Sequence, residues 1–132
     1  MADYEKAVEL WSTIEGLKLN ESDTPEAVES LLARNPDFST VATDKEEIVG
    51  AVLCGHNGRA GQLYHLAVAR PYRRQGIAQA LVAYCFIKLA EARIPRCNVF
   101  VYSNNEAGNH FWNQNGWTDP ARWKVMQKVI RV

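Results

Sequence analysis

The segment RPYRRQGIAQALV, residues 70–82, places three arginines and a glycine directly before a pattern typical of a helix. The first amide N–H groups of a helix lack partners within it, and the helix dipole adds partial positive charge there. Arg73 and Arg74 can pair with phosphate oxygens, while Gly76 and Ala78 let a ligand approach the backbone closely. The segment fits a site for pyrophosphate, with a solvated turn and a nucleic-acid contact as alternatives.

This segment alone is a weak signal, because the chain has neither a GxxxxGK[ST] nor a GxGxxG phosphate fingerprint. Nucleic-acid binding through Arg59, Arg70, Arg73 and Arg74 would show salt-sensitive affinity. The chain has 15 basic and 15 acidic residues, and therefore lacks the basic excess typical of such proteins. We expect no nucleic-acid partner.

Length and composition indicate one globular domain, residues 1–132, with 47% hydrophobic and 23% charged residues. The N-terminus MADYEKAVELW does not resemble a signal peptide, and no apolar run approaches the roughly 20 residues of a membrane span. We expect a cytoplasmic protein without a membrane partner. Cys54, Cys85 and Cys97 form no CxxC pair, which argues against disulfides and a metal site and favours small buried hydrophobes.

The first half of the chain predicts two helices followed by a hairpin. Apolar residues recur at helical spacing in DYEKAVELWSTI, and TPEAVESLLARN begins with Thr24 as N-cap and Pro25 at the first helical position. The β-branched and apolar segments FSTVAT and EEIVGAVLCG are joined by the polar turn DKE. This order predicts two antiparallel strands.

The second half predicts a strand, a helix and a parallel strand. QLYHLAVA is nearly continuously apolar, as in a central strand covered on both faces, and apolar spacing then predicts a helix from Gln75 to about Arg93. IPRCNVFVY returns to strand composition, NNEAGNHFWNQNG reads as a short helix ending at Gly116, and WKVMQKVIRV as a final strand. The fold class is α+β, a mixed α/β arrangement.

Two motifs together resemble the GNAT superfamily of acyl-CoA-dependent N-acetyltransferases. The family has a strand ending in L-x-V and then Q/R-x-x-G-x-G/A opening a helix, matched by LAV at 66–68 and RRQGIA at 73–78. Its second element, N-x-x-A/G-x-x-F/L-Y-x-x-x-G-F, is matched by NEAGNHFWNQNGW. The resemblance implies a central mixed sheet flanked by helices, although the family's first strand is missing ahead of the opening helix.

The resemblance implies transfer of an acetyl group from acetyl-CoA, a cosubstrate, to a primary amine of a small molecule or protein, without a metal. The pantetheine arm would contact the backbone of Leu66 and Val68, with the Leu66 N–H at the thioester carbonyl. The cosubstrate site implied by both motifs comprises Leu66, Val68, Arg73, Arg74, Gln75, Gly76, Ile77, Ala78, Asn105 and Trp112.

The catalytic acid and base depart from the family pattern. Two common base positions hold Gln62 and Phe100, and the usual acid Tyr of the second motif is Trp112. The remaining candidates include His110 and Tyr102 near the second motif. We favour Tyr64 for its location and His65 for its near-neutral titration, with Tyr64 on the face of Gln62 and Leu66 and His65 on the other.

The missing acid and base favour a second hypothesis, a non-catalytic module that binds acyl-CoA without turnover. One measurement distinguishes the two hypotheses, because only an enzyme would release CoA thiol from acetyl-CoA in the presence of an amine. The resemblance also suggests a homodimer.

Overall fold

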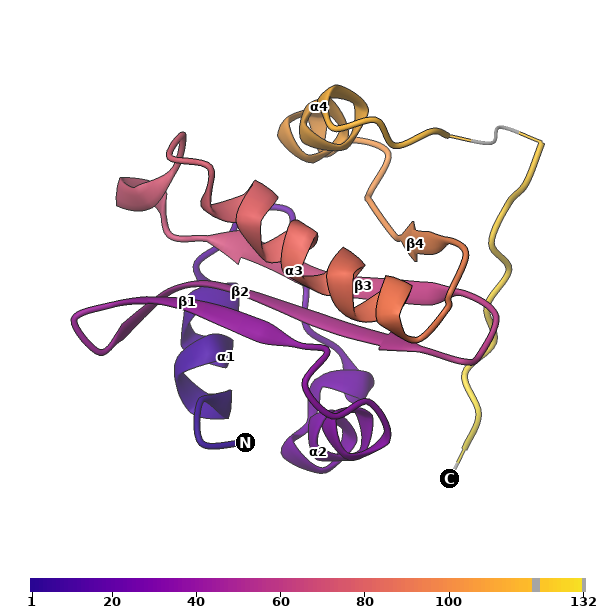
Figure 1. Cartoon of the computed structure of the whole chain (residues 1–132), viewed down its shortest axis with the longest axis horizontal. Helices are drawn as coiled ribbons and strands as arrows, with labels where there is room; N and C mark the ends of the chain where they lie inside the picture. Colours follow the sequence, from indigo (N-terminus) through magenta and orange to yellow (C-terminus); the bar gives the residue numbers. More distant parts are fainter. Residues whose placement is uncertain (120–121, 132) are drawn as a thin grey trace. The chain divides into compact units, whose positions relative to one another are not determined.

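The structure, a computed structural model, describes residues 1–119 and 122–131 (Figure 1). The chain divides into a larger unit, Met1–Tyr102, and a smaller one, Ser103–Val132. The larger unit holds the sheet and the helices that pack on it, and so contains the elements that position most of the predicted site.

Two helices open the larger unit, as the sequence predicts. Their bounds are α1 Tyr4–Ser12 and α2 Pro25–Arg34, with the 3-10 helix η1 Glu21–Asp23 between them. The Thr24 hydroxyl accepts the Ala27 N–H at 3.2 Å, which caps α2 at its N-terminus. Pro25 occupies the first helical position, where its missing N–H costs nothing.

The sheet has four strands in the order β1-β2-β3-β4. Their bounds are β1 Thr40–Asp44, β2 Glu47–His56, β3 Gly61–Val68 and β4 Cys97–Val99. The pairs β1/β2 and β2/β3 are antiparallel, whereas β3/β4 is parallel. Parallel neighbours need a long crossover, and helix α3 (Ile77–Glu91) supplies it. The predicted hairpin, central strand and strand-helix-strand unit are confirmed.

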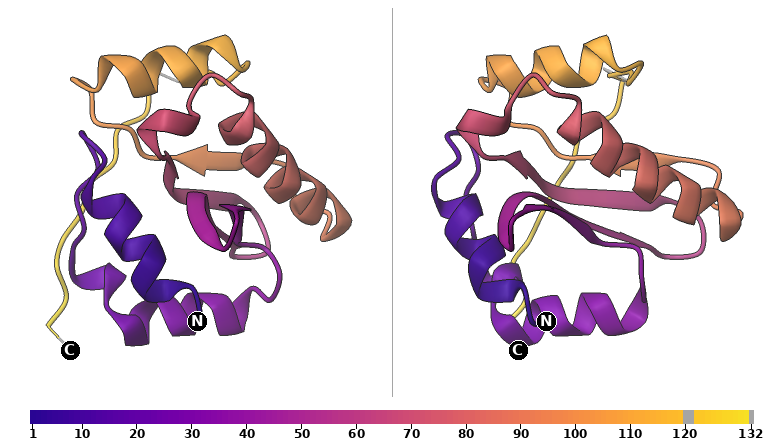
Figure 2. Two further views of the ribbon diagram at one scale, coloured as in Figure 1. Left: turned by 90° about the vertical axis from the view of Figure 1, so that its left-hand side faces the viewer. Right: turned by 60° about the vertical axis from the view of Figure 1, so that its left-hand side comes forward.

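Helices α1 and α2 cover one face of the sheet and α3 covers the other (Figure 2). On the α1/α2 side, Trp11, Val28, Leu53 and Ala67 belong to one buried hydrophobic cluster. Burial of such side chains stabilises the fold by roughly 1.5–3 kcal/mol each. This cluster fixes the two opening helices against the middle of the sheet.

Two glycines allow α3 to lie close to the other face. A Cβ at Gly50 would lie 3.2 Å from Leu81 Cδ1, and one at Gly61 would lie 2.8 Å from Leu89 Cδ1. Cys54 and Cys85 are fully buried in this layer, as free thiols. The helix therefore packs directly on β2 and β3, which fixes where its N-terminus begins.

The smaller unit contains helix α4 (Glu106–Gln114), as predicted, followed by Gly116 with a left-handed φ of +84°. The predicted strand in WKVMQKVIRV is wrong over its described residues 123–131, which form no strand; Val132 lies outside the described residues. Met126 and Ile130 are 84% and 78% exposed. Alternating side chains define faces, but a strand also needs a backbone partner, and the sheet includes none for this segment.

Asn35 ties the end of α2 to β2 from a buried position. Its Oδ1 accepts the His56 N–H at 3.0 Å, and its Nδ2 donates to the Leu31 carbonyl at 3.2 Å. The residue is only 5% exposed. Loss of the amide would remove the acceptor of the partly buried His56 N–H.

Asn35→Ala should lower the free energy of unfolding by about 1–3 kcal/mol, the cost of an unsatisfied buried donor. Urea denaturation of the purified protein measures this. Glu29→Ala, on the exposed side of the same helix, is the matched control and should change stability by less than about 0.5 kcal/mol. Equal stability of the two variants would contradict the role given to Asn35.

Candidate functional site

The edge of β3 that faces β4 is open over its second half. Parallel pairing with β4 stops at Leu63 and Val99. Strand β3 continues to Val68, where it is still paired with Gly50 of β2. Among the described residues, no strand pairs with the backbone groups of residues 64–68 that point away from β2. An extended ligand with amide groups can add to such an edge as an extra strand does.

A β-bulge interrupts β3 beside this edge. Leu53 of β2 pairs with Tyr64, and Ala51 pairs with Ala67. Between these two pairs β2 advances by two residues and β3 by three, so β3 contains one extra residue. His65 lies at the bulge with a φ of +55°, in the left-handed region that non-glycine residues rarely adopt.

The bulge reverses the direction of the backbone amides that follow it. The Gly61 N–H donates to Arg96 O, which precedes β4, while the Ala69 N–H donates to Val49 O of β2. These amides are eight residues apart, and in an uninterrupted strand they would point the same way. The single extra residue between them accounts for the reversal.

The predicted contacts Leu66 and Val68 are placed by this reversal. Counting back from Ala69, whose N–H points to β2, the amides of Val68 and Leu66 point to the open edge. Without the bulge they would point into the β2/β3 ladder instead. The bulge therefore gives the open edge its two donors.

The segment after β3 brings the α3 N-terminus to the end of the same strand. The 3-10 helix η2 (Arg70–Tyr72) turns the chain, and Arg73 Nε donates to the Val68 carbonyl at 3.0 Å. Arg74 has a φ of +63°. Gly76, the N-cap of α3, has a φ of +80° that glycine adopts without strain.

The first turn of α3 is accessible from outside. Among the described residues, no side chain caps it, and a Cβ at Gly76 would have no neighbour closer than Gln79 Oε1 at 4.0 Å. Ile77 packs inward, since its Cγ2 would lie 3.1 Å from a Cβ at Gly50. Ile77 and Ala78 thus offer an anion their backbone N–H groups, rather than charged side chains.

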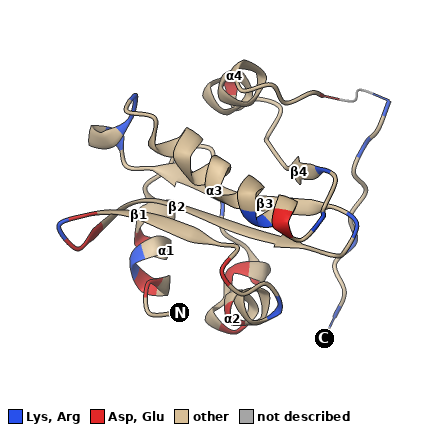
Figure 3. Ribbon diagram, viewed as in Figure 1, with Lys and Arg blue, Asp and Glu red and all other residues tan. Residues whose placement is uncertain are grey.

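The charged side chains of this segment itself are all positive, while Asp44 of β1 accepts a hydrogen bond from the Tyr72 hydroxyl at 2.8 Å. Arg70, Arg73 and Arg74 are the charged residues of segment 69–80 and are exposed, as is Gln75. Figure 3 shows this blue loop ahead of an uncharged first turn of α3. The donors and the charge needed by a pyrophosphate group are both present.

His65 contacts Asp23 and Trp11 on the α1/α2 side of the sheet. Its Nε2 lies 2.7 Å from Asp23 Oδ1, and its ring centroid lies 5.2 Å from that of Trp11. Leu53, the partner of Tyr64, and Ala67 belong to the core on this same side. The predicted alternation, with Tyr64 and Leu66 on one face and His65 on the other, is therefore wrong, because the bulge breaks the two-residue repeat.

Sequence reasoning did not identify Asp23. The pattern Asn20-x-x-Asp23 predicts a helix cap, and the structure has that capping box. Pairing with His65 joins residues 42 positions apart. No local pattern contains this contact.

Tyr64 stands beside the open edge with 38% of its surface exposed. Partial burial raises the pKa of its phenol above the usual value near 10. The phenol is therefore protonated at neutral pH. It can donate a proton or a hydrogen bond but cannot serve as a base there.

The residues at the family's two base positions, Gln62 and Phe100, and the further candidate Tyr102 lie in different surroundings. Gln62 has a buried Nε2 without a hydrogen-bond partner among the described residues. Phe100, beyond the end of β4, is 59% exposed. The Tyr102 ring lies 6.0 Å from Lys18 Nζ in a cation–π contact. None of these is arranged as a proton acceptor.

The second motif belongs to the smaller unit. The Asn105 side chain accepts the Gly108 N–H at 3.0 Å and caps α4. The Trp112 ring packs edge-on against Phe111 and Trp117, with centroids 5.0 and 4.7 Å apart. These contacts build α4 itself, so the cosubstrate role predicted for Asn105 and Trp112 stays a prediction, and exposed His110 has no role assigned to it.

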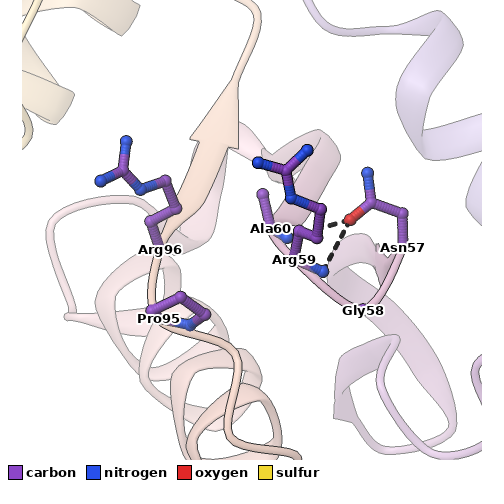
Figure 4. A pocket seen from close by; sticks show the side chains of 6 residues that line it. All are labelled: Asn57, Gly58, Arg59, Ala60, Pro95 and Arg96. Atoms are coloured by element: carbon purple, nitrogen blue, oxygen red, sulfur yellow. Dashed lines mark hydrogen bonds between the residues drawn. The ribbon is translucent and has the colours of Figure 1, made fainter.

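A separate hollow of about 540 Å³ lies past the C-terminal end of α3, opposite to Gly76. Figure 4 shows Arg59 and Arg96 on either side of it, with Asn57 accepting backbone N–H groups across the turn. Helix α3 has 15 residues, about 22 Å at 1.5 Å per residue. Arg59 is therefore remote from the arginines of residues 70–74, and the four do not form one patch.

The cysteines are not arranged for catalysis. A side-chain hydrogen bond with Cys85, together with burial, raises the pKa of the Cys54 thiol. Burial raises the pKa of Cys97 to about 12. In the part of the chain that the structure describes, no cluster of His, Cys, Asp and Glu side chains could hold a metal ion. None of the described helices is long and apolar enough to cross a membrane.

Comparison with known proteins adds the family. A model of the acetyltransferase (GNAT) family matches residues 5–117. Acetyltransferase SG1711 of Sodalis glossinidius is 33% identical over 105 residues, covering 80% of this chain and 73% of that protein. Acetyltransferase plu1384 of Photorhabdus laumondii is 34% identical over 106 residues, covering 80% and 73%.

Solved structures share the fold at low identity. The aminoglycoside 6'-N-acetyltransferase AAC(6')-IG from Acinetobacter haemolyticus aligns with a TM-score of 0.76 and 16% identity, over 99% of this chain and 94% of that one. Arabidopsis thaliana Naa50, solved with the bisubstrate analogue CoA-Ac-MVNAL, aligns with a TM-score of 0.65 and 19% identity, over 87% and 76%. At this identity the likeness supports the mixed α/β fold.

Gly76→Asp should weaken acetyl-CoA binding by about 100-fold or more, because a carboxylate a few ångströms from the pyrophosphate position repels it. Gly76→Asn is the matched control, since asparagine has the same shape, tolerates a left-handed φ and carries no charge. Calorimetric titration measures both affinities, and circular dichroism checks the fold. Equal weakening in the two variants would assign the effect to backbone strain or bulk and contradict an anion site.

Proposed function

This chain belongs to the acetyltransferase (GNAT) family, and on that premise we propose that it transfers an acetyl group from acetyl-CoA to a primary amine by direct attack. The observation that carries the proposal is the open edge of β3 between Leu63 and Val68, which ends beside the uncapped first turn of α3. The open edge of β3 offers backbone amides to a pantetheine arm. The first turn of α3 and the loop before it offer amides and arginines to a pyrophosphate.

The proposed cosubstrate contacts follow from these elements. The pyrophosphate lies on the amides of residues 74–78 with Arg73 and Arg74 beside it, and Gln75 borders the same turn. Arg73 also binds the Val68 carbonyl, so it holds the loop against the strand end. The pantetheine arm lies along residues 66–68 and continues the sheet. Asn105 and Trp112 of the second motif are kept as proposed cosubstrate contacts on the family resemblance alone.

The proposed chemistry is one nucleophilic substitution at the thioester. The amine nitrogen attacks the acetyl carbonyl carbon, the C–N bond forms, and the C–S bond breaks as the CoA thiolate leaves. The Leu66 N–H, aimed at the open edge by the bulge, donates to the carbonyl oxygen as it gains negative charge. Removal of one such donor typically costs about 100- to 1000-fold in turnover.

Two proton transfers accompany this substitution. The amine must lose a proton before or during attack, and the thiolate must gain one. We assign the first role to His65, because a neutral imidazole has a nitrogen lone pair that can accept a proton. Tyr64 takes the second role, because its raised pKa keeps the phenol protonated. Proximity on the enzyme surface supplies a further share of the rate.

We further propose that residues 1–132 act as one domain in the cytoplasm, with no nucleic-acid partner. The neutral balance of charges supports the last point, as do the arginines placed at opposite ends of α3. The homodimer suggested by the family resemblance is kept as a proposal.

Calorimetric titration with acetyl-CoA, followed by thiol release against polyamines, amino acids and N-terminal peptides, tests the function. We expect saturable binding and release of one CoA thiol per amide formed. Binding without release from any amine would favour the non-catalytic acyl-CoA-binding module. No binding would contradict the proposed site, and the arginines would then belong to a solvated turn.

Tyr64→Phe should lower kcat by about 10- to 100-fold, the range for loss of a general acid. Because burial raises the phenol pKa, ionisation of Tyr64 should reduce the wild-type rate only above about pH 10. Below that pH the Tyr64 phenol is protonated in the wild-type protein. The lower kcat of Tyr64→Phe should therefore be seen across the neutral pH range. Tyr84→Phe, at a hydroxyl that donates to Asp37 O, is the control and should leave kcat unchanged. A wild-type kcat in Tyr64→Phe would remove the acid assignment.

A further inference from the structure

Asp23 is a buried carboxylate with both oxygens engaged. Oδ1 lies 2.7 Å from His65 Nε2, and Oδ2 accepts the Asn20 N–H at 2.8 Å. Asp23 is 8% exposed. The Tyr4 hydroxyl donates to the Asp23 carbonyl. These contacts fix the carboxylate in one orientation, with one oxygen committed to the loop and the other to the imidazole.

This orientation determines which nitrogen of His65 carries the proton when the ring is neutral. A carboxylate only accepts hydrogen bonds, so the hydrogen must lie on Nε2. Nδ1 is then the free lone pair. Among the described residues nothing is hydrogen-bonded to Nδ1, and it is not among the buried atoms without partners, which are Trp11 Nε1 and Gln62 Nε2. Solvent therefore reaches Nδ1.

The position of the ring is also fixed. Trp11, 2% exposed, lies against it with a centroid separation of 5.2 Å. His65 is the bulge residue of β3 and directly precedes Leu66 in the chain. Asp23 and Trp11 thus hold the ring that carries the Nδ1 lone pair. The ring belongs to the residue directly before Leu66, whose N–H is assigned to the thioester oxygen.

We propose that Asp23 is a positioning residue for acetyl transfer: it holds neutral His65 as the Nε2–H tautomer, so that Nδ1 accepts the proton of the attacking amine, directly or through one water. The inference rests on the proposed function. In the step, the amine N–H bond breaks as an Nδ1–H bond forms, and the imidazolium so produced stays paired with the carboxylate. Of the described titratable groups, Asp23 from η1 contacts the ring, Tyr4 from α1 contacts the Asp23 carbonyl, and Tyr64 precedes His65 on β3.

The first test is spectroscopic and needs no substrate. Nitrogen-15 NMR of histidine-labelled wild-type protein, at a pH where the His65 signals show a neutral ring, should show the proton on Nε2. In Asp23→Asn the amide has a single acceptor oxygen for two donors, so either the Asn20 or the His65 contact is lost and the tautomer should become mixed or switch to Nδ1–H. A neutral wild-type ring protonated on Nδ1 would overturn the proposal.

The second test is kinetic. Asp23→Asn and His65→Asn should each lower kcat by about 10-fold or more, while the KM for acetyl-CoA changes little. The double variant should be no slower than His65→Asn, because both act through one imidazole. Asparagine suits position 65, since it tolerates a left-handed φ. Asp37→Asn and His56→Asn, distant residues of the same types, are the matched controls and should keep the wild-type kcat.

The outcomes separate the inference from the function. If Asp23→Asn keeps the wild-type kcat while His65→Asn has a lower kcat, the role of Asp23 alone is overturned. Wild-type turnover in both would overturn His65 as the base as well, with acetyl transfer intact. A wild-type protein that binds acetyl-CoA and releases no thiol with any amine would overturn the proposed function, and the inference with it. A higher KM for acetyl-CoA at unchanged kcat would indicate a purely structural contact.

Discussion

The backbone reversal at His65 is the constraint on which the candidate site depends. One extra residue on β3, at a left-handed φ, turns the amides of Leu66 and Val68 from the β2 ladder to the open edge. A left-handed residue costs roughly 1–2 kcal/mol. The hydrogen bond to Asp23 and the contact with Trp11 hold the side chain at this position. Strain at one residue is therefore offset by contacts from two other elements.

The same constraint connects the two faces of the sheet. Helix α3 begins where β3 ends, and Arg73 joins the intervening loop to the Val68 carbonyl. On the opposite face, Asp23 brings the loop between α1 and α2 against the bulge. The strand thus meets the proposed anion-binding turn at its end and the proposed proton acceptor, His65, at its bulge.

Much of the fold was predictable because its signals are local. Thr24, Pro25 and the apolar spacing define α2, and Gly76 after the arginines marks the start of α3. Single contacts between residues far apart in the sequence were missed. Alternation placed His65 on the wrong face, because a bulge has no sequence signal here. Asp23 was not identified, since its local pattern accounts only for a helix cap. The final strand has a pattern but no partner among the described residues.

The exchange rates of individual backbone amides in β3 test the bulge account most directly. We predict that saturating CoA slows hydrogen exchange at Leu66 and Val68, whose N–H groups point to the open edge. Ala67, whose N–H points to β2, should change little. Slower exchange at Ala67 with unchanged Leu66 and Val68, under saturating CoA, would contradict the reversal at His65 and the site built on it.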